Sequence, residues 1–197
     1  MKPYAESCDQ NREPILNVIQ PLLQAKSSVL EIGSGTGQHA VYFAEKMPHL
    51  TWHTSDKQEN HDGIRQWLEE AALENTRPPL ELDVSRNTWP EPSIDTVFSA
   101  NTAHIMHWPE VEAMFAGVGR LLPPQGLFLL YGPFNYDNRY NSESNQRFDQ
   151  WLKGRDSNSG IRNFQDLDQL AHETGMTLLQ DNAMPANNRT LAWGKGG

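Results

Sequence analysis

The segment Val29-Leu-Glu-Ile-Gly-Ser-Gly-Thr-Gly37 decides the fold of this chain. Its apolar residues suit a buried strand over residues 28–32, and three glycines at alternate positions then allow a tight turn. Residues 40–47 continue with apolar side chains at helical spacing, so a helix follows the turn directly. A strand, a glycine-rich turn and a helix N-terminus predict a loop that holds a nucleotide-like ligand with its backbone N–H groups.

The glycine spacing differs from the dinucleotide fingerprint, which needs glycines at the first, third and sixth positions. Counting from Gly33, Gly35 is in place, but Gln38 stands at the sixth position and Gly37 comes one residue early. Glu31 adds a carboxylate that would repel a diphosphate and attract an ammonium or sulfonium group. We therefore expect a cofactor without phosphate, and a nicotinamide-dependent dehydrogenase is the disfavoured alternative.

Composition limits the classes of partner. The chain has 197 residues, a net charge of −9 and a mean hydropathy of −0.67, which suits a single domain and disfavours a nucleic-acid partner. No apolar run reaches the roughly 20 residues that cross a bilayer, and the N-terminal region lacks a secretory core. A single cysteine, Cys8, permits no internal disulfide. We expect a cytoplasmic protein with a small-molecule substrate and no membrane partner. The sequence makes no prediction of the oligomeric state.

Strand-like and helix-like segments alternate along the chain, which predicts an α/β fold with helices on both faces of a sheet. A helix is expected to begin at Asn11–Pro14, because proline suits a first turn. The polar segment 132–163 has one helical patch and is expected to be a substrate lid within a single domain, residues 1–197. The predicted strands cover residues 28–32, 50–56, 79–84, 94–100, 127–131, 176–180 and 190–193.

Acidic residues end three successive predicted strands: Glu31, Asp56 and Asp83. The carboxyl ends of parallel strands form one rim, where ligands bind in open α/β sheets. Asp56 follows Gly37 by 19 residues and would accept hydrogen bonds from both ribose hydroxyls, while Asp83 and Val84 would hold an adenine. Each aspartate alone is equally well explained as a turn residue, but their joint occurrence favours a binding rim.

The Glu-x-Gly-x-Gly-x-Gly sequence resembles motif I of the class I S-adenosylmethionine-dependent methyltransferases, in which the carboxylate and the loop hold the methionine end of the cofactor. Further segments resemble the DUF938 family, a methyltransferase-like group that includes methyltransferase-like protein 26. The resemblance implies a Rossmann-like three-layer α/β sandwich, a seven-stranded mostly parallel sheet with an antiparallel seventh strand, and S-adenosyl-L-methionine as cofactor. The segments that carry it are Cys8–Ile15, Tyr131–Phe134, Ser142–Asp149, Gly160–Asn163 and Met184–Asn188.

The resulting hypothesis is a methyltransferase that acts on an unidentified small molecule. The Asn/Asp-Pro-Pro-aromatic sequence typical of amino-group DNA and protein methyltransferases is absent after the fourth predicted strand, which disfavours an exocyclic or amide nitrogen acceptor. The alternative is a non-catalytic S-adenosylmethionine-binding or scaffolding protein. Asn11 and Arg12 are expected to fold over the cofactor's carboxylate, although helix capping by Asn11 explains that residue equally well. The predicted cofactor-binding residues are Glu31, Gly33, Gly35, Gly37, Asp56, Asp83, Val84, Asn101, Asn11 and Arg12.

His104 and His107 follow the fourth predicted strand and are the candidate catalytic residues, since a general base is needed when the acceptor is protonated. The favoured alternative is that His104 packs against the cofactor while His107 caps a helix or is exposed. Two histidines without a third ligand make a weak metal site, so no metal is expected.

Substrate-binding residues are expected in and beside the lid, where arginines would receive a carboxylate or phosphate. A solvated loop, with its arginines paired to Asp137, Asp149 and Asp156, is an equally good explanation. The candidates are Tyr131, Phe134, Arg139, Trp151 and Arg162.

Overall fold

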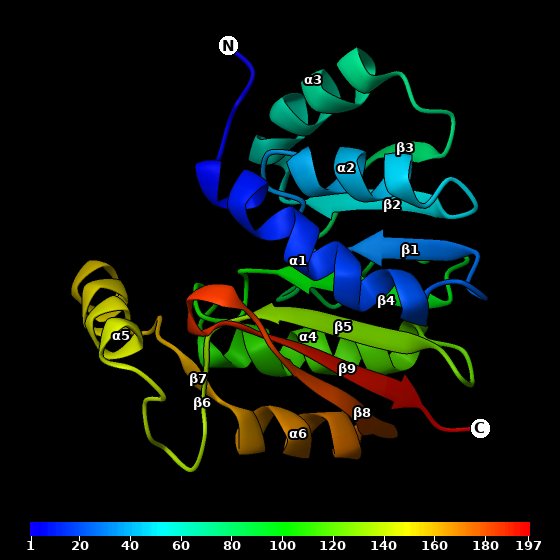
Figure 1. Cartoon of the computed structure of the whole chain (residues 1–197). Helices are drawn as coiled ribbons and strands as arrows, with labels where there is room; N and C mark the ends of the chain where they lie inside the picture. The colour runs from blue at the N-terminus through cyan, green and yellow to red at the C-terminus, as the bar shows by residue number, and fades with distance from the viewer. The chain divides into compact units, whose positions relative to one another are not determined.

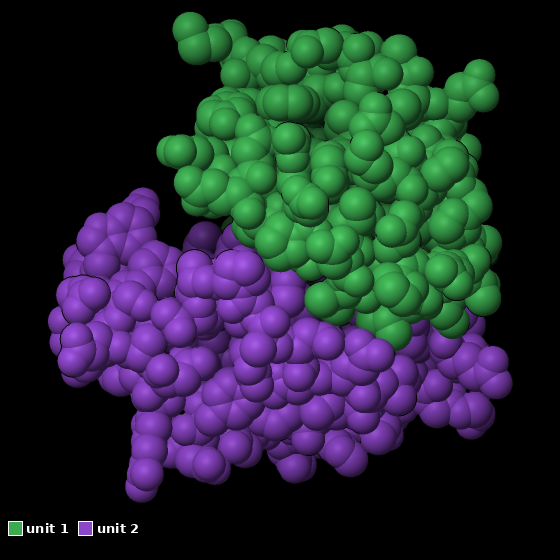
Figure 2. All heavy atoms as spheres, viewed as in Figure 1, with its two compact units in different colours: residues 1–99 green, residues 100–197 purple.

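The computed structural model describes residues 1–197, and Figure 1 labels its helices and strands. The chain divides into two compact units, residues 1–99 and residues 100–197, which Figure 2 distinguishes by colour. We refer to them as unit 1 and unit 2.

Unit 1 holds three helices and the strands that precede and follow them. The strand β1 pairs in parallel with β2 and β4, and β2 pairs in parallel with β3. The helix α1 packs on α2, and α2 packs on α3. The elements are α1 (Glu6–Leu22), β1 (Ser28–Glu31), α2 (Gln38–Lys46), β2 (Thr51–Asp56), the 3-10 turn η1 (Gln58–Asn60), α3 (His61–Ala71), β3 (Thr76–Glu81) and β4 (Thr96–Ala100), whose last residue belongs to unit 2.

An aromatic cluster packs the second half of α2 against the sheet of unit 1. The ring centroid of Phe43 on α2 lies 5.6 Å from that of Trp52 on β2 and 5.4 Å from that of Phe98 on β4. All three side chains are fully buried, and fully burying an aromatic side chain stabilises the fold by about 2–3 kcal/mol. Because α2 begins directly after the glycine-rich loop, the cluster also fixes the C-terminal end of that loop.

Unit 2 is built on strands from the C-terminal half of the chain. The strand β9 pairs antiparallel with both β5 and β8, and β6 pairs with β7 in a separate parallel pair. The helix α6 packs against α4 and β8. The elements are α4 (Trp108–Leu121), β5 (Leu127–Gly132), β6 (Phe134–Asn135), α5 (Glu143–Arg155), β7 (Arg162–Asn163), α6 (Phe164–Glu173), β8 (Met176–Ala183), the 3-10 turn η2 (Pro185–Asn187) and β9 (Arg189–Lys195).

The main sheet has seven strands in the order β3-β2-β1-β4-β5-β9-β8. Its last strand in the chain, β9, is the antiparallel one, so the predicted seven-stranded, mostly parallel α/β sheet is confirmed. The helical patch predicted within residues 132–163 is α5. No helix combines the length and the apolar character needed to cross a membrane.

Two predicted elements begin three or more residues away from their observed starts. The first helix begins at Glu6 rather than at Asn11–Pro14, so Pro14 lies inside α1. The local proline signal is overridden because the main chain of Ala5, just before the helix, is hydrogen-bonded to the side chain of Gln38. The third strand covers Thr76–Glu81 rather than 79–84. It lies at the edge of the sheet, where proline is tolerated because one side of the strand needs no N–H donor.

Substitution of two loop glycines is expected to have unequal effects. Gly37 has a φ of 94°, and a Cβ there would lie 3.2 Å from Ile64 Cα and from Trp67 Cβ. Gly37→Ala should therefore lower the free energy of unfolding by about 3 kcal/mol, through left-handed strain and overpacking together. Gly35 has a φ of 59° with nothing within 4 Å of a Cβ, so Gly35→Ala should cost about 1 kcal/mol. Urea denaturation measures both values, and equal losses would contradict this packing.

Candidate functional site

The glycine-rich loop after β1 is held in an open turn by positive φ angles and by hydrogen bonds to β2. The φ values are 71° at Gly33, 59° at Gly35 and 94° at Gly37. Ser34 N–H donates to Ser55 O at 2.9 Å, and Ser55 N–H donates to Ser34 Oγ at 3.1 Å. Because the loop is tied to β2 from both directions, the end of β1 and the end of β2 lie together.

Glu31 is a buried carboxylate at the last position of β1. Its side chain is 2% exposed, and its Oε2 accepts a hydrogen bond from Trp52 Nε1 at 2.9 Å. Burial raises the pKa of Glu31 to about 7, although the hydrogen bonds from Trp52 and Ser34 act in the opposite direction. No lysine or arginine of unit 1 forms an ion pair with it. A cation placed beside this carboxylate would lower its pKa and be bound by it.

Asp56 lies at the end of β2 and contacts the glycine-rich loop. Its Oδ2 accepts from Gly35 N–H at 2.8 Å, while its Oδ1 accepts from Lys57 N–H at 2.7 Å and from Asn60 Nδ2 at 2.9 Å. A Cβ at Gly35 would meet no atom within 4 Å, so a space that the protein does not fill lies beside the loop. Of the predicted residues, Glu31, the three glycines and Asp56 are thus brought together.

Asp83 and Val84 lie just beyond the end of β3. Asp83 Oδ1 accepts from Ser85 Oγ at 2.6 Å and from Ser85 N–H at 3.0 Å, and these hydrogen bonds hold the pKa of Asp83 below its usual range. Val84 is buried. This geometry is that of a turn residue, the alternative that the sequence left open for Asp83. The backbone N–H of Leu82 donates to Asp56 O at 3.0 Å, which keeps this turn next to the end of β2.

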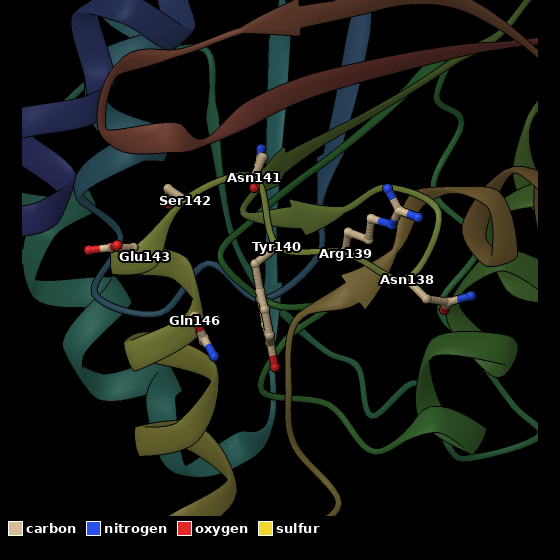
Figure 3. A pocket seen from close by; sticks show the side chains of 7 residues that line it. All are labelled: Asn138, Arg139, Tyr140, Asn141, Ser142, Glu143 and Gln146. Carbon is tan, nitrogen blue, oxygen red and sulfur yellow. The ribbon is translucent and has the colours of Figure 1, made fainter.

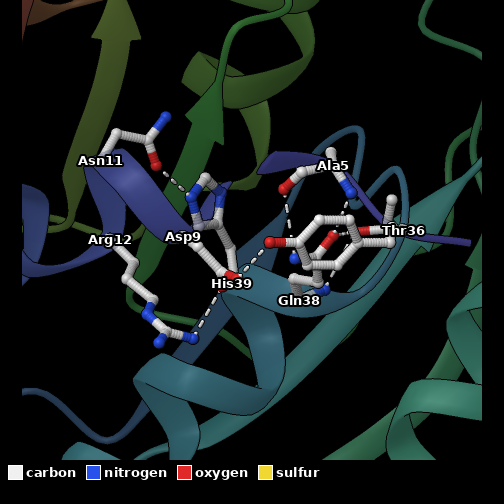
Figure 4. A network of polar contacts seen from close by, with 8 residues as sticks. Ala5, Asp9, Asn11, Arg12, Thr36, Gln38 and His39 are labelled. Carbon is white, nitrogen blue, oxygen red and sulfur yellow. Dashed lines mark hydrogen bonds and ion pairs between the residues drawn. The ribbon is translucent and has the colours of Figure 1, made fainter. Parts of the chain in front are cut away.

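Asn11 and Arg12 lie in the interior of α1, so the helix-capping explanation for Asn11 is wrong. Asn11 Oδ1 lies 2.6 Å from His39 Nε2 on α2. Arg12 forms an ion pair with Asp9 at 2.8 Å, and its guanidinium carbon lies 4.7 Å from the ring centroid of Tyr42. Figure 4 shows the polar network in which Asn11 and Arg12 take part.

The contacts of Gln38 were not predicted from the sequence, where this residue only replaces the sixth-position glycine of the dinucleotide fingerprint. Its side chain is 3% exposed, accepts from Ala5 N–H at 2.7 Å and donates to Ala5 O at 3.2 Å. Thr36 Oγ1 donates to Gln38 Oε1 at 2.9 Å (Figure 4). An amide that pairs with both the N–H and the C=O of one distant residue leaves no periodic signal in the sequence.

His104 is the more buried of the two candidate catalytic residues. Its side chain is 5% exposed, and its ring packs edge to face on Phe148 with centroids 5.3 Å apart. Burial, and to a lesser extent the positive charge of Arg162, lower the pKa of His104 to about 4. The imidazole is therefore neutral at pH 7 and is a weak general base.

His107 is the N-cap residue of α4, in agreement with the capping alternative. Its N–H donates to Glu110 Oε2 at 2.8 Å, and the two residues form a capping box. Its Nε2 lies 2.6 Å from Asp156 Oδ2, and this hydrogen bond holds the pKa of Asp156 below its usual range. Its side chain thus joins the start of α4 to the end of α5.

Arg162 binds backbone carbonyls. Its Nε donates to Ala103 O at 3.1 Å, and its Nη2 donates to Asn158 O at 2.9 Å and to Met106 O. A guanidinium with three carbonyl acceptors clamps the segment after β4 against the segment that precedes β7. This arrangement favours a structural role for Arg162 over recognition of a substrate anion.

The other predicted substrate-binding residues differ in their exposure to solvent. Tyr131 and Phe134 are buried, and Tyr131 O accepts a hydrogen bond from Asn101 N–H at 2.9 Å. Trp151 is 53% exposed and stacks on Phe148 with ring centroids 5.8 Å apart. Arg139 is exposed in the tight turn between β6 and α5.

A polar hollow of about 480 Å³ lies beside that turn, and Figure 3 shows the side chains that line it. A second hollow of about 420 Å³ includes Trp108 and Arg162. Both are formed largely by residues of the segment predicted to be a lid. The first is lined by Asn138, Arg139, Tyr140, Asn141, Ser142, Glu143 and Gln146.

The sequence matches a family described as "Protein of unknown function (DUF938)" over residues 2–195. The fold is similar to that of human N-acetylserotonin methyltransferase in complex with S-adenosylmethionine, with a TM-score of 0.82 and 18% identity over 98% of this chain and 53% of that chain. It is also similar to the apo form of the S-adenosylmethionine-dependent methyltransferase SibL, with a TM-score of 0.81 and 20% identity over 97% of this chain and 56% of that one.

A third similar structure is an O-methyltransferase family 2 protein from Planctomyces limnophilus in complex with apigenin. Its TM-score is 0.75, with 13% identity over 85% of this chain and 50% of that chain. This chain therefore spans about half the length of the structures it matches. Its fold is that of the class I methyltransferases.

Replacing the Arg162 guanidinium should destabilise unit 2. Arg162→Met leaves carbonyl groups without their donor, and we expect a loss of about 2 kcal/mol in the free energy of unfolding. Arg139→Met is the matched control, because Arg139 is exposed in a turn, and it should change that free energy by less than about 0.5 kcal/mol. Urea denaturation followed by circular dichroism measures both, and an unchanged midpoint for Arg162→Met would contradict the clamp.

Proposed function

The chain belongs to the DUF938 family, and we propose that it is an S-adenosylmethionine-dependent methyltransferase that acts on a small molecule. The observation that carries the proposal is the buried carboxylate of Glu31 beside an open glycine-rich loop. The cofactor supplies an electrophilic methyl group on a sulfonium, and it also carries an ammonium group. A buried carboxylate with a raised pKa and no ion pair in unit 1 suits such an ammonium.

Different residues of the chain would bind different parts of the cofactor. Glu31 would hold the ammonium, and the loop at Gly35 offers unfilled space at the backbone. Asp56 would accept a hydrogen bond from the ribose hydroxyls, since its Oδ2 accepts only from Gly35 N–H and keeps a second lone pair. Asp83 and Val84 would hold the adenine. Asn11 and Arg12 remain predictions for the carboxylate of the cofactor, and Asn101 remains a prediction for cofactor binding.

The fold's similarity to proteins of known cofactor and ligand supports the proposal. Human N-acetylserotonin methyltransferase is in complex with S-adenosylmethionine, and the Planctomyces limnophilus protein is in complex with apigenin, a small molecule. We further propose a single-domain protein of the cytoplasm in which residues 132–163 cover the acceptor. The single cysteine supports a reducing compartment, and the polar hollows in that segment support a role in acceptor binding.

Catalysis would depend on positioning more than on proton transfer. The low pKa of His104 makes it a poor base at neutral pH, and His107 is part of the capping box at the start of α4. We therefore propose an acceptor that presents a free lone pair at neutral pH, held in line with the methyl group. The same two histidines favour the second candidate function, a protein that binds S-adenosylmethionine without transferring its methyl group.

Cofactor binding should depend on pH through Glu31. With the pKa of Glu31 near 7 in the free protein, binding of an ammonium below that pH requires release of a proton. The affinity for S-adenosylhomocysteine, which carries the same ammonium, should therefore fall about tenfold per pH unit below 7 and level off above it. Isothermal titration calorimetry from pH 5.5 to 8.5 measures this. Glu31→Gln should remove the pH dependence, and an equally steep profile in that variant would contradict the assignment.

The ribose assignment is tested by Asp56→Asn, which keeps the size of the side chain. We expect S-adenosylhomocysteine to bind about 10- to 100-fold more weakly, because a charged acceptor of a ribose hydroxyl is lost. Asp62→Asn on α3 is the matched control, since Asp62 forms only an exposed pair with Arg65, and its affinity should be unchanged. Equal affinities of Asp56→Asn and the unaltered protein would contradict the role of Asp56.

Turnover is measured with S-adenosylmethionine labelled in its methyl group and the small-molecule fraction of a cell extract. Transfer of label to a compound is the expected result. Tight binding without transfer to any fraction would favour the non-catalytic candidate. Absence of binding at millimolar S-adenosylhomocysteine would overturn the proposal.

A further inference from the structure

The N-terminal segment before α1 is held against α3. Trp67 Nε1 donates to Pro3 O at 2.6 Å, and the Lys2 ammonium lies 3.6 Å from the Trp67 ring centroid and 2.7 Å from Glu70 Oε2. A Cβ at Gly63 would lie 2.5 Å from Pro3 Cγ, so the segment approaches α3 at the one position where the helix has no side chain. Any side chain at position 63 would displace Pro3.

The next residues of the segment are held by the start of α2. Gln38 Oε1 accepts from Ala5 N–H and Gln38 Nε2 donates to Ala5 O, so a single amide pairs with both polar groups of one residue. Thr36 Oγ1 donates to Gln38 Oε1, which fixes the orientation of that amide (Figure 4). Because Thr36 and Gln38 flank Gly37, this pairing connects the segment directly to the glycine-rich loop.

The first turn of α1 reaches the same loop. The Cys8 thiol is hydrogen-bonded with Thr36 and is close enough to Glu31 for the negative charge of that residue to act on it. Burial, and to a lesser extent the negative charge of Glu31, raise the pKa of the Cys8 thiol to about 11. Residues 2–8 therefore extend from α3, past Gln38, to the loop whose Glu31 is assigned to the cofactor.

We propose that residues 2–8 form a strap against the glycine-rich loop, that Gln38 is the positioning residue that latches it, and that the latched strap slows release of the bound cofactor. This inference rests on the proposed binding of S-adenosylmethionine. The strap is attached by few groups, and Tyr4 at its centre is 61% exposed, so its local opening requires much less free energy than global unfolding.

The test uses Gly63→Ala in the full chain. Alanine is a better helix former than glycine, so α3 is not weakened, but its Cβ displaces Pro3. Gly154→Ala on α5 is the matched control, because a Cβ there meets nothing within 4 Å. The first measurement is the dissociation rate of S-adenosylhomocysteine by stopped flow. We expect Gly63→Ala to raise it about tenfold with no fall in the thermal midpoint, and Gly154→Ala to leave it unchanged.

Cys8 supplies a second measurement, because it is the only cysteine in the chain. The rate of its alkylation by N-ethylmaleimide reports how often the strap opens. We expect bound S-adenosylhomocysteine to slow this reaction, and Gly63→Ala and Gln38→Met to accelerate it by about fivefold or more at constant pH. Gln38→Met keeps the length of the side chain and removes both hydrogen bonds to Ala5.

The outcomes separate the strap from the proposed function. If S-adenosylhomocysteine binds to the unaltered protein but leaves Cys8 alkylation unchanged, the strap is wrong while cofactor binding stands. Equal dissociation rates in Gly63→Ala, Gly154→Ala and the unaltered protein would also overturn the strap. Absence of binding to the unaltered protein overturns the proposed function, and the strap with it.

Discussion

The hydrogen bond from Trp52 to the buried carboxylate of Glu31 is the interaction on which the site of unit 1 depends. A carboxylate this deeply buried is costly unless donors surround it, and here indole and serine groups supply them. Trp52 in turn belongs to the aromatic cluster that positions α2. One packed ring system therefore fixes both the acidic group at the end of β1 and the helix at the far end of the loop.

Burial also determines the charge state of one titratable group in each unit. Glu31 is only partly ionised near pH 7, and His104 in unit 2 is neutral at the same pH. Neither group has the pKa of its exposed counterpart, and in both cases burial is the main cause. Groups with strongly shifted pKa values are common at functional sites, where a bound ligand supplies interactions that the buried group lacks in the free protein.

Sequence reasoning found what depends on local pattern. The apolar run, the alternating glycines and the acidic strand ends predicted β1, its loop and the placement of Glu31 and Asp56 beside it. It failed where a distant partner overrides the local signal: Ala5 is held by Gln38, and Pro78 and Pro79 lie on an edge strand. Arg162 bonds to carbonyls more than fifty positions away along the chain, and no spacing rule shows such partners.

The attachment of Lys2 and Pro3 to α3 makes residues added before position 1 more disruptive than residues added after position 197. Residues fused ahead of Met1 would join directly to a segment held by a few hydrogen bonds, and would compete with those bonds by pulling it into solvent. Gly197 is exposed, and nothing surrounds it within 4 Å of a Cβ position. Residues added after position 197 would therefore displace none of the contacts described above.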